Sequence, residues 1–168
     1  MTQNVFRFLW LIDIPAACIL AVLLRRFVFM LVFVKGTSML DTLQNGELML
    51  VRRYGRKSIP RRGDIVISTF PSRKQLFVKR LVALPGETFS MEDDTVFIDG
   101  IPITETYPHR RCLRRTASVT LEDDQYYLLG DNRSASHDSR SMGPVHRRDL
   151  KGRCVCVLFP LNRIRRLR

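Results

Sequence analysis

Two apolar stretches open the chain. Residues 8–24 form a largely apolar run of 17 residues, the short end of the range for a membrane-spanning helix. Asp13 lies near the N-terminal end of this run, where its charge reaches the interface at reduced cost. The second stretch, residues 27–34, is too short to span and rich in phenylalanine and valine, which is typical of a buried strand. The pattern therefore predicts a tail and membrane-spanning helix at 1–26, followed by one domain at 27–168.

Three other interpretations of the N-terminal stretch compete with a membrane span. A cleaved signal peptide is disfavoured, because only Arg7 and the α-amine precede the run as charges and no clear small-x-small site follows it. A lipid anchor at Cys18 is disfavoured because Pro15 stands where a lipobox usually has leucine. A buried core helix is the main competitor. The pair Arg25–Arg26 raises a separate conflict, since the positive-inside rule would place the following domain in the cytoplasm.

From residue 35 onward, short apolar runs alternate with turn signals such as Asn45-Gly46 and Pro85-Gly86. Several short strands at this spacing indicate a mainly β domain. Residues 105–120 are polar and arginine-rich, and they are predicted to be a surface excursion. The candidate strands in this part of the chain are 47–53, 64–70, 76–83, 95–98, 126–129 and 153–159.

Composition adds a strong positive charge to this picture. The formal net charge is +12, and only five of the 28 basic residues are lysines, which gives each lysine more weight. A cationic face favours an anionic partner such as lipid headgroups or nucleic acid. A basic surface that is exposed only to solvent explains the charge equally well. No aromatic-basic binding motif is present, so no nucleic-acid partner is predicted.

The four cysteines do not indicate a metal site. Cys18, Cys112, Cys154 and Cys156 form no C-x-x-C pair and have no histidines at zinc spacing. Cys154 and Cys156 lie two residues apart in an apolar run, so both fall on one face of a strand and are expected to be small buried side chains. A disulfide from Cys112 to either of them is left open by the sequence.

Two residues carry candidate chemistry. Ser38 follows an apolar strand and Gly36-Thr37, a position that exposes both its hydroxyl and its backbone N–H. Lys79 shares one face of a strand with Phe77. If that face is the core face, burial lowers the lysine pKa and makes the amine a base for a nearby serine. Neither residue is convincing alone, because turn serines and edge-strand lysines are common.

A third segment, residues 130–140, follows a predicted strand and is dense in hydrogen-bonding groups of both charge signs. Such a segment can supply an ion pair and a hydroxyl that orient a neutral lysine. A solvated loop has the same composition.

Taken together and in order, these segments resemble the conserved boxes of type I signal peptidases. Residues 36–42 (GTSMLDT) are similar to the serine box of that family, and residues 78–87 (VKRLVALPGE) to its lysine box. Residues 62–66 (RGDIV) resemble the box between them. Residues 130–140 (GDNRSASHDSR) match the G-D-N-R-x-x-S-x-D-S-R signature, and the resemblance extends from residue 8 to about residue 160.

The resemblance implies a mainly antiparallel β peptidase domain with one transmembrane helix, and a mechanism without metal or cofactor. It implies that Ser38 is the nucleophile and Lys79 the general base. Ser136 would hold the Lys79 amine by a hydrogen bond. Asp138 and Arg140 would form a supporting salt bridge.

The resemblance also implies how substrate binds. The Ser38 backbone N–H would donate to the oxyanion. An extended substrate would pair with strand edges, and its small side chains would fill shallow pockets lined by Val32, Val34, Phe77 and Val78. The substrates would be secreted preproteins cut after small-x-small sequences.

The expected protein is a monomer in contact with membrane lipids, a single-pass protein of the cell membrane. Its catalytic domain is expected on the extracytoplasmic side, which follows the family against the charge of Arg25–Arg26. Two departures from the family pattern stand out: Asp41 replaces the usual proline of the serine box, and Gly36 provides no side-chain oxyanion donor.

Three other functions compete. A self-cleaving repressor-type peptidase uses the same serine–lysine chemistry but needs an upstream DNA-binding motif, whereas the residues before the serine box are apolar. A catalytically idle membrane-tethered assembly factor is disfavoured by the presence of both Ser38 and Lys79. A basic nucleic-acid-binding module is favoured by charge alone.

Overall fold

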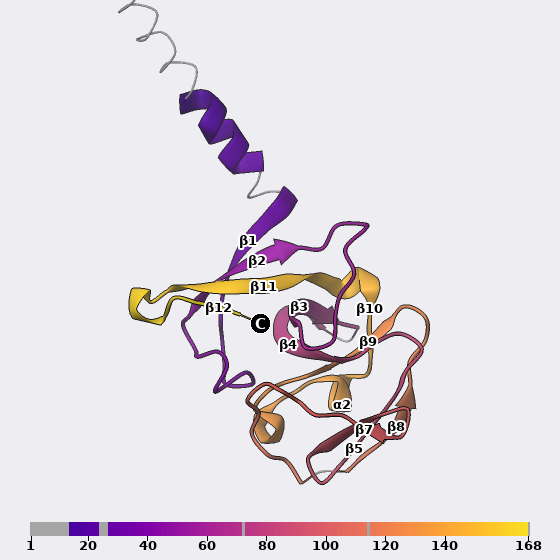
Figure 1. Ribbon diagram of the computed structural model, residues 1–168. Helices are drawn as coiled ribbons and strands as arrows, with labels where there is room; N and C mark the ends of the chain where they lie inside the picture. Colours follow the sequence, from indigo (N-terminus) through magenta and orange to yellow (C-terminus); the bar gives the residue numbers. More distant parts are fainter. Residues whose placement is uncertain (1–13, 24–26, 72, 114, 168) are drawn as a thin grey trace, which may run out of the picture.

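Short strands joined by tight turns form two antiparallel sheets (Figure 1). The computed structural model describes residues 14–23, 27–71, 73–113 and 115–167. The eight-stranded sheet has the order β1-β2-β11-β3-β4-β9-β10, with β12 paired to β11. Its strands are β1 (Phe29–Phe33), β2 (Leu48–Arg53), β3 (Ile65–Phe70), β4 (Arg73–Ala83), β9 (Gln125–Leu129), β10 (Val145–His146), β11 (Leu150–Phe159) and β12 (Arg165–Arg166).

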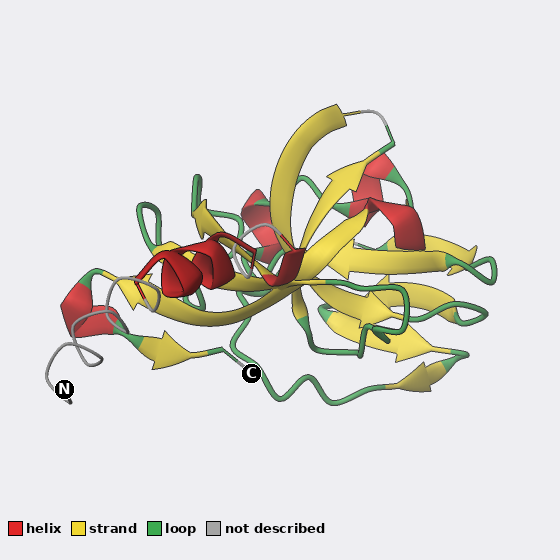
Figure 2. Ribbon diagram, turned by 90° about the horizontal axis from the view of Figure 1, so that it is seen from above, coloured by secondary structure: helices red, strands yellow, loops and turns green. Residues whose placement is uncertain are grey.

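The second sheet has four strands in the order β7-β6-β5-β8. Figure 2 shows that the helices between the strands of both sheets are short. The strands of the smaller sheet are β5 (Thr88–Glu92), β6 (Thr95–Ile98), β7 (Ile101–Pro102) and β8 (Thr116–Thr120). The short helices are η2 (Arg133–Ala135), α2 (Ser139–Met142), η3 (Arg147–Asp149) and η4 (Leu161–Arg163).

The centre of the larger sheet is covered on both faces. On β3, Ile65 and Ile67 pack into one apolar cluster with Met39 and Met49. Val66, which points the other way, packs into a second cluster. β4 lies next to β3, and its second half shares this double burial, so the side chains of residues 79–83 are removed from water on both faces. A third cluster supports the smaller sheet.

Most predicted strands are confirmed. Each candidate strand named above, and the apolar stretch at residues 27–34, contains a strand, and the ends agree within a few residues. The strands that the pattern missed are short or polar, namely β5, β7, β8, β10 and β12. The prediction for residues 105–120 is wrong in part, because β8 lies inside this range and the Cys112 side chain is buried.

The N-terminal prediction falls partly outside the described residues. Residues 14–23 are helical and exposed. The remaining residues of the predicted span at 8–24 lie outside the described part of the chain, as do residues 24–26 before the predicted domain boundary. Among the helices that the structure describes, none has the length and apolar content to cross a membrane.

The cysteine side chains resolve the question that the sequence left open. All four are free thiols, so Cys112 makes no disulfide with Cys154 or Cys156. Cys154 is buried, as expected for a small core residue, and Cys156 on the same strand is only partly covered.

Candidate active site

Ser38 lies in a turn that leaves β1. Gly36 enters this turn with φ of +92°, a conformation that favours glycine, and its N–H donates to Asn45 Oδ1 at 2.9 Å. Two hydrogen bonds from Asn132 fix the turn from the other side. Its backbone N–H donates to the Ser38 carbonyl at 3.0 Å, and its side-chain amide donates to the Thr37 carbonyl at 3.1 Å. The nucleophile candidate is therefore held by the 130–140 segment.

Lys79 reaches this serine from β4. Its Nζ lies 2.7 Å from Ser38 Oγ, although the two residues are 41 positions apart. Lys79 is 2% exposed, which confirms that its face of the strand is buried. Burial lowers the pKa of Lys79 to about 8, against a smaller opposing effect of Asp138. A substantial fraction of the amine is therefore neutral at mildly alkaline pH and able to accept the Ser38 proton.

Both side chains open into a groove of about 550 Å³, called here the active-site groove. Its walls come from β1, from the serine turn and from the first half of β4. The predicted substrate-binding residues are all in it, since its lining includes Val32, Val34, Phe77 and Val78 together with Ser38 and Lys79.

The groove lies between two strand edges. β1 is an edge strand of the larger sheet and is paired with β2. β4 pairs with β9 only from Arg80 onward, so its residues 77–78 are paired with β3 on one side, and residues 75–78 line the groove on the other. Unpaired backbone groups at a strand edge are templates for an added strand.

The 130–140 segment contains the predicted salt bridge. Arg140 Nε and Nη2 each lie 2.8 Å from a carboxylate oxygen of Asp138. The Gly130 N–H donates to the same carboxylate at 3.0 Å. Burial raises the pKa of Asp138, but the Arg140 guanidinium outweighs this and holds the pKa below its usual value. Asp138 therefore stays ionised near Lys79.

Ser136 does not make its predicted hydrogen bond with the Lys79 amine. Its Oγ is buried and makes no hydrogen bond to the amine, but it lies close enough to the Asp138 carboxylate to help lower the pKa of that group. The hydroxyl nevertheless lies close to the site, because a Cβ added at Gly130 would come within 2.2 Å of Ser136 Oγ and 2.5 Å of the Ser38 carbonyl oxygen. Only glycine at position 130 allows these two segments to approach each other so closely.

Arg80 and Asp131 form a buried ion pair that the sequence did not assign to the site. Arg80 Nε and Nη2 lie 2.8 and 2.7 Å from the two Asp131 oxygens, and both side chains are almost fully buried. The Thr42 hydroxyl donates to Asp131 at 2.5 Å. This pair therefore ties β4 and the 130–140 segment to the end of the serine turn.

The polar segment near residue 105 also supports the site. Arg133 makes an ion pair with Glu105 in which both side chains are buried, and the Tyr107 ring lies 3.9 Å from the Arg80 guanidinium carbon. The alternation of apolar and polar residues cannot reveal such contacts. A polar residue outside a strand pattern looks like a solvent-exposed one until the distant residue that it binds is known. The density of charges in GDNR was the only signal.

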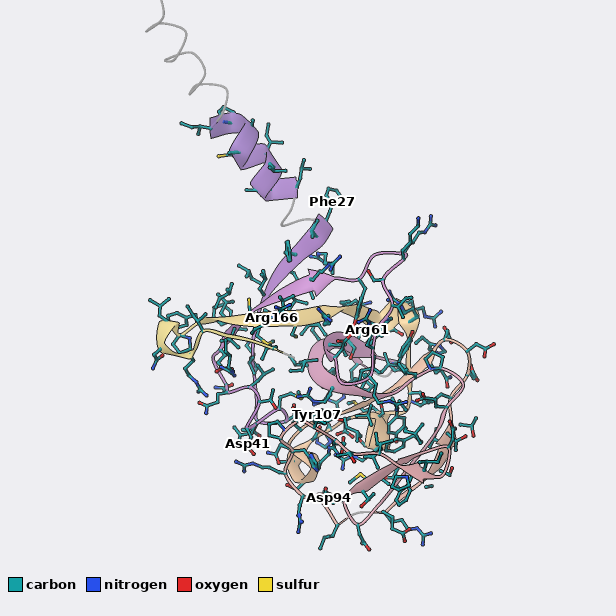
Figure 3. The ribbon with its side chains drawn as sticks, in the orientation of Figure 1. Phe27, Asp41, Arg61, Asp94, Tyr107 and Arg166 are labelled. Atoms are coloured by element: carbon teal, nitrogen blue, oxygen red, sulfur yellow. The ribbon has the colours of Figure 1, made fainter. Side chains whose placement is uncertain are left out.

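Asp41 has φ of +80°, in the left-handed region. Proline is restricted to φ near −65°, so this turn differs from one built around the proline of the family pattern. The Asp41 carboxylate instead accepts two hydrogen bonds from Arg110, at 2.8 and 3.0 Å. Figure 3 shows Asp41 on the same side of the molecule as Tyr107, whose segment leads to Arg110.

Restoring the family residue is therefore expected to harm this protein. Asp41→Pro should lower kcat/KM for peptide cleavage on the order of 10- to 100-fold, because it forces the turn beside Ser38 out of its conformation. Asp41→Gly is the matched control, since it keeps the positive φ and removes the same ion pair. Wild-type activity in Asp41→Pro would contradict the role given to this turn.

Comparison with known proteins agrees with this geometry. The family described as "Signal peptidase, peptidase S26" matches residues 7–159. This chain belongs to that family. It is similar to signal peptidase I of Bacillus licheniformis, with 37% identity over 171 residues that cover 95% of this chain and 92% of the relative.

Two further similarities lie within the family. Signal peptidase I T of Bacillus subtilis (strain 168) is 36% identical over 168 residues, covering 93% of this chain and 87% of the relative. A crystal structure of a signal peptidase I from Enterococcus faecalis V583 is 30% identical, with a TM-score of 0.49, and covers 57% of this chain and 97% of the other.

Proposed function

We propose that this protein is a membrane-anchored serine endopeptidase that removes signal peptides from secreted preproteins. The observation that carries the proposal is the 2.7 Å contact between Ser38 Oγ and the buried Lys79 amine at the floor of the active-site groove. A serine hydroxyl beside a desolvated lysine is a nucleophile with its base. The names of the relatives supply the substrate class.

In the proposed mechanism, neutral Lys79 takes the Ser38 proton as Oγ attacks the scissile carbonyl. The C–N bond then breaks, the signal peptide remains as an ester on Ser38, and the protonated lysine gives its proton to the leaving amine. Lys79 next takes a proton from water, which hydrolyses the ester. As the ester C–O bond breaks, Lys79 returns this proton to Ser38 Oγ, so Lys79 acts in turn as base and acid and the free enzyme is restored.

The surroundings of the pair support these steps. No described group accepts a hydrogen bond from the Ser38 N–H, which leaves it available to the oxyanion. Gly36 provides no second donor from a side chain. The buried Ser136 hydroxyl, close to Asp138, is suited to hold the amine once the Ser38 proton has moved. Asp138, fixed by Arg140, supplies a nearby negative charge.

An extended substrate is proposed to lie between the edges of β1 and β4. Its backbone would pair with residues 32–34 and 75–78. Its small side chains would point into the apolar walls of the groove. The catalytic domain would lie on the extracytoplasmic side and be anchored by the N-terminal apolar segment, so that the substrate's own apolar segment brings the cleavage site to Ser38.

The test is cleavage of a purified preprotein by the full chain in neutral detergent. A preprotein with an Ala-x-Ala site should give a single cut after the second alanine, identified by N-terminal sequencing of the product. Changing that alanine to phenylalanine should slow cleavage at least about 100-fold, since the proposed pockets at Val32, Val34, Phe77 and Val78 take small side chains. Equal cleavage of both substrates would overturn the assignment of Val32, Val34, Phe77 and Val78 to substrate binding.

A further inference from the structure

A second cavity, in which six of the eleven lining residues are cationic, lies between the end of β2 and the loop that leads to β3. It has a volume of about 670 Å³ and is called here the cationic hollow. Asp64 is the one carboxylate in its lining. The basic residues of the lining are Arg52, Arg53, Arg56, Lys57, Arg61 and Arg153.

Two of these arginines face each other at a cost in stability. Arg52 on β2 and Arg153 on β11 are direct cross-strand partners. Like charges in this position destabilise a sheet. Asp64 relieves only part of the repulsion, because it lies 3.3 Å from Arg153 and also accepts the Arg61 N–H at 3.0 Å. An unrelieved concentration of guanidinium groups is a feature that a bound anion would stabilise.

The loop that forms the hollow is held in place by its own hydrogen bonds. The Ser58 hydroxyl accepts the Gly55 N–H at 3.0 Å, and the Ser58 N–H donates to the Gly55 carbonyl at 3.1 Å. Arg147 donates to the Ser58 carbonyl at 2.9 Å, and its guanidinium carbon lies 4.8 Å from the centre of the Tyr54 ring. The hollow is therefore formed before any ligand binds, which lowers the entropic cost of binding.

Exposed apolar side chains flank the hollow. Ile59, at its rim, is 81% exposed. Arg52 is the direct cross-strand partner of Phe29, so one end of the hollow lies beside the start of β1, two residues after exposed Phe27. The helix at residues 14–23 continues from this end of β1 (Figure 1). A cationic surface with an apolar rim matches the lipid–water interface, where phosphates lie above acyl chains.

We propose that the cationic hollow binds the phosphate headgroups of anionic lipids and seats this end of the sheet on the membrane surface. This inference rests on the proposed anchoring of the N-terminal segment, and it adds a defined lipid site to it. Arginine forks suit phosphate oxygens through paired hydrogen bonds. Ile59 would enter the acyl boundary beside them. Lipid is favoured over nucleic acid because the exposed Ile59 side chain would find no apolar contact on a phosphate backbone.

The test uses the full chain in nonionic detergent micelles doped with dioleoylphosphatidylglycerol or dioleoylphosphatidylcholine. Native mass spectrometry across a lipid titration counts the lipids that each variant retains. Changing Arg52, Arg53, Arg56 and Lys57 to glutamine should weaken phosphatidylglycerol binding at least tenfold, on the estimate of about 1 kcal/mol per basic residue at an anionic surface. Phosphatidylcholine retention should not change.

The matched control removes the same charge elsewhere, by changing exposed Arg73, Arg111, Arg115 and Arg148 to glutamine. It should bind phosphatidylglycerol like the wild type. The proposal is overturned if the first variant binds phosphatidylglycerol normally or if the control loses as much. It is overturned as well if the first variant keeps its lipid binding and loses binding to duplex DNA instead.

Peptide cleavage in the same micelles separates this proposal from the peptidase assignment. Both variants should cleave a peptide at the wild-type rate, because the hollow and the active-site groove share no residue. Failure of the wild type to cleave would refute the peptidase assignment alone. Normal cleavage with unchanged lipid binding in the first variant would refute the lipid site alone.

Discussion

Lys79→Met is expected to abolish peptide cleavage and, at the same time, to stabilise the protein. The loss in kcat/KM should be at least about 10⁴-fold, the range seen when one member of a nucleophile–base unit is removed. Ser38→Ala should lower kcat/KM by the same factor, because Ser38 Oγ and Lys79 Nζ lie 2.7 Å apart and act as one unit. The double variant should be no worse than either single one. Lys151→Met, on the surface of β11, is the matched control and should retain wild-type activity.

The stability gain follows from the pKa of Lys79. Burial lowers this pKa from 10.5 to about 8. Between these values the unfolded chain binds more protons than the folded chain, so stability rises with pH through this window. Below pH 8 the amine is charged in both states, and its burial costs roughly 3 kcal/mol of unfolding free energy. Methionine removes this cost, so the gain should be present at pH 7 and disappear above about pH 10.5.

The pH dependence of activity gives an independent measurement. For the wild type, kcat/KM should rise tenfold per pH unit and level off near pH 8, as the neutral amine becomes the main form. An inflection near 10.5 would mean that Lys79 is solvated in solution. A profile without inflection between pH 6 and 9 would mean that another group is the base.

Alternation in the sequence was compatible with a buried Lys79 but could not distinguish it from an edge-strand lysine, and it gave no indication that Arg80 is buried. Period-two alternation divides a strand into one buried and one exposed face, which holds when one side of a sheet meets water. β4 lies inside the larger sheet and is covered on both sides, so Arg80 is 1% exposed even though it points away from Lys79. Burial of the second face depends on elements far away in the chain.

The same limit explains what was missed around the site. The serine and lysine boxes are local patterns, and the structure brings Ser38, Lys79, Asp138 and Arg140 together as the resemblance implied. Glu105 belongs to no pattern, because only its buried partner Arg133 distinguishes it from a solvated residue. A left-handed turn at position 41 also follows from tertiary contacts rather than from local preference.

The Arg80–Asp131 pair provides the largest expected loss of stability. Arg80→Met should lower the unfolding free energy by about 3–5 kcal/mol, because it leaves the Asp131 carboxylate buried without its counter-ion. Urea unfolding in detergent would measure this as a shift of the midpoint. Arg80→Met combined with Asp131→Leu should recover most of the loss, since the second change removes the unpaired charge and leaves two apolar side chains in contact.

Activity should not recover in the double variant. Asp131 accepts the Thr42 hydroxyl, and its neighbour Asn132 holds the Ser38 carbonyl, so this carboxylate links the ion pair to the serine turn. With leucine at position 131 the turn loses that link, and kcat/KM should remain on the order of 100-fold below the wild type although the fold is restored. A double variant that regains both stability and activity would show that the pair serves the core alone. Recovery of stability without activity would show that the buried charges position Ser38.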